Sequence, residues 1–260
     1  MRTAILYIST GKYNQFFTGF YRSSKEYFLC NHEKQYFVFT DDISLGENKD
    51  DVHIIKKECR GFPLDSLFRF EMFLELEEQL KSFDYIFFFN ANMIFLKHIG
   101  EDILPNKENG DLVAVIHPGF YNKPDFLYPY ERKKKSMAYI LPHLKEYHYF
   151  MGSLNGGKSL NYLNLIKSCA QNIRKDYENN IIAIVHDESH LNKYLTEHIC
   201  LNLSPSYAYP DGSKLPFEPI ILLIDKVKID PYFNKGRDFT FFGNIKKAYD
   251  IIVRAVLWNF

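Results

Sequence analysis

Apolar runs of strand length alternate with segments of helical spacing along the first third of the chain. The strand-like runs cover residues 4–8, 36–39, 53–57 and Tyr85–Phe89. Between them, residues 16–29 and 66–82 place apolar side chains three and four positions apart, the spacing of one helix face. This β-α-β order predicts an α/β fold with a mostly parallel sheet and helices on both faces.

Polar residues directly follow three of these predicted strands, at positions 9–13, 40–42 and 90–92. In parallel α/β sheets, the carboxyl ends of the strands form the edge at which ligands bind. We therefore expect the binding site at these three turns.

The second half of the chain has a less regular pattern. Residues 112–117 and 181–185 are predicted to be strands, and residues 159–177 a helix. The aromatic and glycine-rich stretch 147–157 is predicted to be a loop whose backbone can approach a ligand closely. Prolines and charges dominate from about residue 205 to 260, which predicts an irregular tail and a candidate lid over the site. We expect residues 1–260 to form one domain.

Composition limits the class of partner. The 32 basic and 32 acidic residues give a formal net charge of zero, so the chain has no basic footprint for a nucleic acid. Phe and Tyr are abundant, at 24 and 19 residues. Tyrosine combines a stacking face with a hydroxyl, which suits a sugar or nucleoside site, but such a composition is equally typical of a Phe-rich core.

The cysteines and the apolar runs bear on the cellular compartment. Cys30, Cys59, Cys169 and Cys200 lie far apart without metal-ligand spacing, which favours reduced thiols. The apolar run at residues 4–8 is too short for a signal-peptide core, and no stretch has the length of a membrane span. We expect a complete, soluble, cytoplasmic protein.

The tripeptide Asn90-Ala91-Asn92 stands between two apolar runs. Its two amides lie on the same side of an extended segment, and buried amides need hydrogen-bond partners. These amides therefore form either a local turn network or a ligand contact.

Five polar residues follow the predicted strand 181–185, in the order His186-Asp187-Glu188-Ser189-His190. On extended backbone, Asp187 and Glu188 point to opposite faces, which indicates two separate roles. Two alternatives remain open. The histidines have the i, i+4 spacing of helical zinc ligands, although the motif is not His-Glu-x-x-His. Alternatively, Asp187 caps the N-terminus of a helix, and the negative charge of Glu188 near that terminus interacts favourably with the helix dipole.

Taken together, these segments resemble the family of the blood-group A and B transferases and the α-1,3-galactosyltransferases. The resemblance covers about residues 4–210, and its strongest stretch is residues 186–195. The other matching stretches are residues 36–41, 83–85, 117–121, 130–132, Ser136, 138–140 and 203–205.

The resemblance implies the GT-A fold, a Rossmann-like nucleotide-binding sheet merged with an acceptor-binding half. It implies transfer of galactose or N-acetylgalactosamine from UDP to the 3-hydroxyl of a galactose, with retention of the donor's α-configuration. The acceptor galactose in this family often carries an α-1,2-linked fucose, so the expected partners are UDP-GalNAc or UDP-Gal and a fucosylated galactoside.

One motif departs from the family pattern. Family members carry Asp-x-Asp, which holds Mn²⁺ against the donor diphosphate, whereas this chain has Asn90-Ala91-Asn92. Without a metal, each carboxylate would repel a diphosphate by about 3–4 kcal/mol at roughly 5 Å and an effective dielectric near 20. Amides remove that repulsion and supply N–H donors. We therefore expect a metal-independent enzyme with no cofactor, as in the bacterial branch of the family.

The resemblance also assigns roles residue by residue. Glu188 is the expected nucleophile or oxocarbenium-stabilising carboxylate. His117 and Tyr209 are expected to bind the acceptor. Met151 and Ser153 are expected to discriminate the 2-substituent of the donor, with GalNAc favoured. The remaining residues expected to bind the donor are Ile8, Ser9, Thr10, Tyr13, Arg69, Asn90, Ala91, Asn92 and Asp187.

The departing UDP also needs positive charge near its phosphates. Lys226, Lys228 and Lys235 are candidates, and Lys235 is the residue that we assign to the donor site. Two other functions stay open from the sequence: a glycan- or nucleotide-sugar-binding protein that lost catalysis with its Asp-x-Asp, and a retaining glycoside hydrolase. The hydrolase requires a second carboxylate about 5 Å from Glu188, and Asp187 is poorly oriented for that role.

Overall fold

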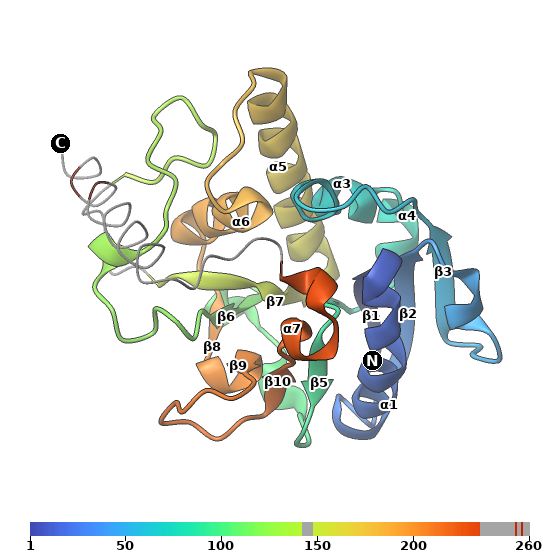
Figure 1. The fold of residues 1–260 in the computed structure, drawn as a ribbon. Coiled ribbons are helices and arrows are strands. Elements are labelled where there is room, and N and C mark those ends of the chain that lie inside the picture. The colour runs from blue at the N-terminus through green and yellow to red at the C-terminus, as the bar shows by residue number, and fades with distance from the viewer. Residues whose placement is uncertain (142–147, 235–252, 254–255, 257–260) are drawn as a thin grey trace.

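The computed structural model describes residues 1–141, 148–234, 253 and 256. Lys235, which we assigned to the donor site, lies outside the described residues. Figure 1 shows a central sheet with helices packed against it and the blue N-terminal strand near its middle.

A seven-stranded sheet, in the order β3-β2-β1-β4-β7-β6-β8, forms the centre of the molecule. Only β7 runs antiparallel to its neighbours; the other pairs are parallel, which confirms the mostly parallel sheet. The strands are β1 (Arg2–Ser9), β2 (Glu33–Thr40), β3 (Val52–Lys56), β4 (Tyr85–Phe89), β6 (Leu112–Ile116), β7 (Phe150–Lys158) and β8 (Leu201–Leu203).

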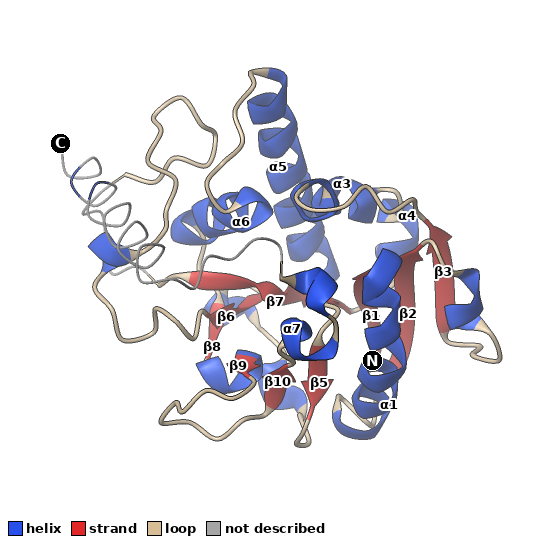
Figure 2. Cartoon of the chain, in the orientation of Figure 1, coloured by secondary structure: helices blue, strands red, loops and turns tan. Residues whose placement is uncertain are grey.

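Each face of the sheet has its own apolar core. Figure 2 shows α5 and α6 on one side of the sheet and α1 with a small sheet on the other. The first layer contains α2 (Leu64–Leu67), α3 (Arg69–Leu74), α4 (Glu77–Leu80), α5 (Ser159–Glu178) and α6 (His186–Glu197). The second contains α1 (Phe17–Tyr27), β5 (Met93–Phe95), β10 (Ile221–Leu223) and β9 (Tyr209–Pro210). Because both faces are covered, β4 is apolar and buried at every position.

The predicted loop 147–157 is wrong: most of it is β7, which lies between β4 and β6. Glycine is uncommon inside strands, so the sequence pattern did not predict one here. At two positions, however, glycine is required because the neighbouring backbone lies too close for a side chain. A Cβ on Gly156 would lie 2.5 Å from the carbonyl oxygen of Ile86, and one on Gly157 would lie 2.5 Å from that of Asp111. These positions exclude side chains while keeping the ladder paired.

Three other predicted elements need correction. Residues 66–82 form parts of three short helices, because Phe68 and Leu76 leave helical dihedrals. The helix at 16–29 is preceded by a 3-10 turn and starts at Phe17. Residues 181–185 form no strand; the backbone turns directly into α6, and the isoleucines at 182 and 184 are exposed.

The segment from about residue 205 contains more structure than we expected. Its strand β10 pairs antiparallel with β5, and its described part also contains α7 (Lys226–Ile229) and a 3-10 turn, Pro231–Phe233. No helix among the described residues has both the length and the apolar character to cross a membrane.

Candidate active site

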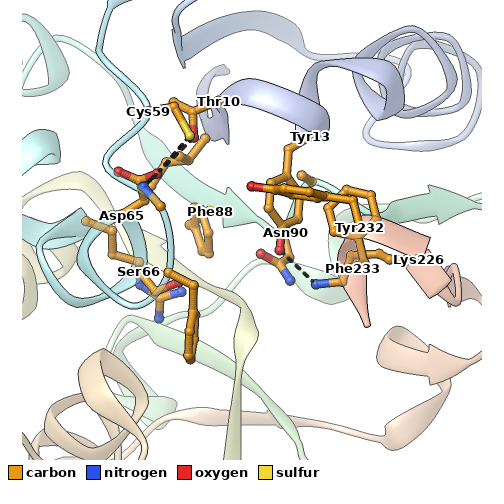
Figure 3. Close-up of a pocket in the computed structure, with 15 residues that line it drawn as sticks. Thr10, Tyr13, Cys59, Asp65, Ser66, Phe88, Asn90, Lys226, Tyr232 and Phe233 are labelled. Carbon is orange, nitrogen blue, oxygen red and sulfur yellow. Dashed lines mark hydrogen bonds between the residues drawn. The ribbon is translucent and has the colours of Figure 1, made fainter. Parts of the chain in front are cut away.

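A cavity of about 350 Å³ opens at the carboxyl ends of β1 and β4, and we call it the strand-end cavity. Figure 3 shows its walls: Thr10, Cys59 and Asp65 lie on one side, Tyr13, Lys226, Tyr232 and Phe233 on the other, and Phe88 between them. Six of the expected donor residues line it together with Lys226: Ile8, Thr10, Tyr13, Arg69, Asn90 and Ala91.

The Thr10 wall is fixed by one carboxylate. The hydroxyl of Thr10 donates to Asp65 at 3.1 Å, and the same side chain accepts the backbone N–H groups of Arg60 at 3.1 Å and Gly61 at 3.0 Å. Asp65 thus connects the end of β1 to the loop before α2. The predicted turn 40–42 supports this wall from outside the cavity, since Asp41 accepts the N–H of Gly11 at 2.9 Å.

The opposite wall combines aromatic rings with a cation. The ammonium of Lys226 donates to the hydroxyl of Tyr13 at 3.2 Å and lies 5.0 Å from the centre of its ring. The ring of Phe233 packs edge-on against Tyr13, with 4.9 Å between ring centres. An aromatic face beside a cation suits a base and a phosphate group.

The Asn90-Ala91-Asn92 turn forms the base of the cavity and is also part of the fold. The amide of Asn90 donates to the side-chain oxygen of Asn92 at 3.2 Å, and the Asn92 amide donates to the carbonyl of Ile224 at 2.7 Å. The local turn network that we considered is therefore present and includes both amides, and Asn90 also lines the cavity, where a ligand contact by it stays a prediction.

These side chains do not fit a divalent cation. Mn²⁺ and Mg²⁺ prefer carboxylate oxygens, whereas this turn offers amides, and the Asn92 oxygen already accepts a hydrogen bond. Among residues 1–141 and 148–234, no group of three His, Cys, Asp or Glu side chains could hold a metal. That includes the His186 and His190 pair considered for zinc.

Arg69 connects the strand-end cavity to a second, buried group of residues. Its guanidinium pairs with Asp187 at 2.7 Å and donates to the carbonyl of Gly152 at 2.8 Å. It lies 4.6 Å from the ring centre of Phe88. Both charged side chains are less than a tenth exposed. Burial raises the pKa of Asp187, and Arg69 opposes that rise by favouring the carboxylate.

Glu188 occupies the next position on α6, in its first turn. One carboxylate oxygen accepts the hydroxyl of Tyr149 at 2.5 Å, and the other accepts the N–H of Gly152 at 2.6 Å. Burial raises the pKa of Glu188 to about 7, against the effect of these two donors. We call Arg69, Tyr149, Gly152, Asp187 and Glu188 the Glu188 cluster.

The predicted separation of Asp187 and Glu188 holds, but for a different reason. They lie on a helix, not on extended backbone, and α6 has no side-chain cap, so the capping role suggested for Asp187 is wrong. His186 before them has a left-handed backbone, with φ of 51°. Such strain in a non-glycine residue is concentrated at functional sites, and here it precedes the two carboxylates.

His117, at the end of β6, is held in one tautomer. Its Nδ1 accepts the N–H of Gly119 at 2.9 Å, so Nε2 carries the proton and is a donor. Burial lowers the pKa of His117 to about 4, which keeps the ring neutral. The ring packs against Phe120 and Tyr149, with centres 4.9 and 5.7 Å apart.

The other expected residues lie outside the walls of the strand-end cavity. Met151 and Ser153 flank Gly152 in a β-bulge of β7. Ala114 of β6 pairs with Asn155, but the next residue, Val115, pairs with Met151, so three residues of β7 are left out of the ladder with β6. Bulges change the direction of the backbone, and here the N–H of Gly152 donates to Glu188. The hydroxyls of Ser9 and Ser153 are buried without a hydrogen-bond partner in the described part of the chain.

Tyr209 bonds within its own loop: its hydroxyl donates to the carbonyl of Ser213 and accepts the N–H of Leu215, both at 3.0 Å. Sequence reasoning missed Tyr149, Gly152 and Asp65 as individual site residues. The only signal for Tyr149 and Gly152 was the aromatic and glycine stretch that contains them.

Comparison with known proteins agrees with this geometry. Residues 3–229 match the family model described as Glycosyltransferase family 6. The chain is 38% identical over 244 residues to the O-antigen biosynthesis glycosyltransferase WbnI of Escherichia coli, covering 94% of this chain and 98% of that protein.

Vertebrate relatives match over a smaller share of their length. The globoside alpha-1,3-N-acetylgalactosaminyltransferase 1 of Gallus gallus is 33% identical, covering 88% of this chain and 67% of that protein. The histo-blood group ABO system transferase 1 of Rattus norvegicus is 34% identical, covering 76% and 58%. The fold, the strand-end cavity and these matches agree: the chain belongs to glycosyltransferase family 6.

Proposed function

We propose that this enzyme moves N-acetylgalactosamine or galactose from a UDP donor to the 3-hydroxyl of a galactose in a fucosylated glycan, with retention and without a metal. The observation that carries the proposal is the Glu188 carboxylate, held by two hydrogen bonds beside a cavity suited to a nucleotide. The names of the vertebrate relatives, an α-1,3-N-acetylgalactosaminyltransferase and a blood-group transferase, support the sugar and the linkage.

The strand-end cavity would hold UDP between its two walls. The ring of Tyr13 offers a face for uracil, and Thr10 offers a fixed hydroxyl on the other side. Lys226 and Arg69 place positive charge where the diphosphate would lie. This arrangement leads from the base at Tyr13 toward the sugar at the Glu188 cluster.

At the Glu188 cluster, the bond between the sugar C1 and UDP breaks, a bond from C1 to the acceptor oxygen forms on the same face, and the departing UDP phosphate takes the proton of the acceptor hydroxyl. Glu188 stabilises the positive charge that develops at C1, either through space or by a transient bond. Asp187, neutralised by Arg69, is placed to hydrogen-bond the donor sugar. The Nε2–H of His117 orients the acceptor galactose, and Tyr209 would contact it.

Independence from metal follows from the donor set at residues 90–92. Amides neither repel the diphosphate nor bind Mn²⁺ well, and Lys226 and Arg69 line the same cavity and can supply positive charge in place of the metal. Asn90→Asp with Asn92→Asp should weaken UDP binding in metal-free buffer, because one new carboxylate would line the cavity and the second would lie two residues away in the same turn. Unchanged binding by calorimetry would contradict this.

The donor preference that we propose is UDP-GalNAc over UDP-Gal. An acetamido group needs a hydrogen-bond partner, and the buried Ser153 hydroxyl has none among the described residues. Met151 beside it is flexible and can move aside. We expect a ratio of about ten to a hundred in kcat/KM, from a hydrogen bond of about 1–3 kcal/mol. Ser153→Val should narrow or reverse the ratio; a wild-type ratio in this variant, or an outright preference for UDP-Gal, would contradict the preference.

Product analysis tests the reaction itself. Purified protein is incubated with each UDP-sugar and a fucosylated galactoside, and the product is examined by mass spectrometry and NMR. The proposal predicts a trisaccharide with a new α-1,3 linkage. UDP-sugar binding without any product would instead favour a non-catalytic binding protein.

A further inference from the structure

Tyr149 and Gly152 are the residues of the Glu188 cluster that belong neither to the family motif nor to the cavity lining, and of the two only Tyr149 contributes a side chain. It is 1% exposed and lies just before β7. Its hydroxyl donates to one oxygen of Glu188 while the N–H of Gly152 donates to the other. The two donors lie within one four-residue segment, from Tyr149 just before β7 to Gly152 within it, so both oxygens are bonded to the same stretch of chain and the carboxylate has little rotational freedom.

The ring of Tyr149 is itself held on several sides. It packs against the rings of Phe120, Tyr128 and Tyr130, with centres 5.1 to 5.9 Å apart. Its carbonyl accepts the N–H of His117 at 2.8 Å, which extends the β6–β7 pairing by one step. The residue that holds Glu188 is therefore paired by its backbone with the residue expected to orient the acceptor.

The charged and titratable groups around Glu188 define what its ionisation depends on. Arg69 faces it from α3, Asp187 from its own helix, and Tyr149 from the β7 side. Arg69 is already paired with Asp187 at 2.7 Å, and the effects of these two charges on the pKa of Glu188 oppose each other. Burial raises the pKa of Tyr149 well above its usual value, so its hydroxyl keeps the proton that it donates.

We propose that Tyr149 is a positioning residue that fixes the Glu188 carboxylate toward the sugar C1, favours its ionised form, and aligns it with His117. This inference rests on the proposed role of Glu188. It adds a requirement that the proposed function alone does not make: removal of one hydroxyl that touches no substrate should alter catalysis through Glu188.

The test is Tyr149→Phe, which keeps the ring and its packing but removes the donor. We expect UDP affinity to be unchanged and kcat/KM at pH 7 to fall by about tenfold or more, the effect of losing a hydrogen bond to a charged group. The acid limb of the kcat/KM profile should move to higher pH by about 1, because the carboxylate loses a group that stabilises its anion.

Tyr36→Phe is the matched control. It removes a buried hydroxyl that hydrogen-bonds Ser24 at 2.9 Å, in the core on the α1 side of the sheet, and should leave the pH profile in place. Thermal unfolding checks that both variants fold. An unshifted acid limb in folded Tyr149→Phe, or a change confined to the acceptor KM, overturns the inference. Glu188→Gln separates the two failures. If Tyr149→Phe gives such a result and Glu188→Gln is fully active, the proposed function is wrong. If Tyr149→Phe gives such a result and Glu188→Gln is inactive, only the inference about Tyr149 is wrong.

Discussion

The strand-end cavity and the Glu188 cluster lie on either side of Arg69, yet they are built differently. The cavity is open, and its polar groups Thr10, Asn90 and Lys226 come from separate parts of the chain. The cluster is largely buried, and each carboxylate in it already has partners: Asp187 has Arg69, and Glu188 has Tyr149 and Gly152.

This difference separates two tasks. An open cavity whose polar groups come from separate parts of the chain binds a nucleotide through several independent contacts, so losing one group should mainly weaken binding. The Glu188 carboxylate is partly buried and has a donor on each oxygen, so it is preorganised, and a small displacement should mainly slow the chemical step. Substitutions on the two sides should therefore affect different kinetic constants.

The largest effect should come from Glu188→Gln. The amide has nearly the same shape but no negative charge, so it cannot stabilise the positive charge at C1. We expect kcat to fall by about a thousandfold or more while the Kd for UDP, measured by calorimetry, stays within twofold. A variant that keeps more than about a tenth of wild-type kcat would assign the chemistry to another residue.

Gly152→Ala should have the next largest effect. An added Cβ would lie 2.9 Å from the Arg69 guanidinium and 3.3 Å from a Glu188 oxygen, so both side chains must shift. A misplacement of about 1 Å can cost about a hundredfold in kcat, so we expect the smaller shift in Gly152→Ala to lower kcat by about tenfold or more. Gly100→Ala, whose Cβ would meet its nearest atom at an ordinary 3.4 Å, is the control. Equal kcat values for the two variants would show that the cluster tolerates displacement.

On the cavity side, Lys226→Met should raise the KM for the UDP-sugar by about tenfold and change kcat less, because a charge-assisted contact to the diphosphate is lost. Lys228→Met is the comparison. Lys228 lies on the same short helix but pairs with Asp211 at 2.9 Å, outside the cavity lining. If both variants weaken donor use equally, the effect comes from overall charge and not from the cavity.

The smallest effect is the pH dependence of the unmodified enzyme. Glu188 must be ionised to act, and its pKa is raised to about 7, so activity should be lost as the pH falls through 7. We expect kcat/KM to fall about fivefold from pH 7 to pH 6, as the ionised fraction drops from about a half to a tenth. His117, with a pKa lowered to about 4, should contribute nothing in this range. If kcat/KM does not change between pH 6 and pH 7, the pKa of Glu188 lies outside this range.

Sequence patterns predicted the regular parts of the fold for clear physical reasons. The apolar run Tyr85–Phe89 is buried because helices or a second sheet cover both faces of β4. The pattern failed where tertiary contacts dominate. Gly156 and Gly157 sit in a central strand because neighbouring backbones approach them, which no local propensity reports. Residues 181–185 have strand-like side chains but form no strand, because the backbone turns directly into α6.

The site shows the same division. Motif residues such as Arg69, Asp187 and Glu188 were found from sequence, and the structure brings them together. Tyr149 and Asp65 were not, because their importance lies in what they hold: the Glu188 carboxylate and the Thr10 hydroxyl. Supporting residues of this kind become visible only when distances are known.

The most direct test of the account is the rate of sugar transfer in excess EDTA. The enzyme is incubated with UDP-GalNAc or UDP-Gal and a fucosylated galactoside, and trisaccharide is measured with EDTA and then with added Mn²⁺. Because the turn at residues 90–92 offers amides in place of the carboxylates that a divalent cation prefers, and Lys226 lines the same cavity, we predict equal rates in both conditions. Activity that disappears in EDTA and returns with Mn²⁺ would contradict the account.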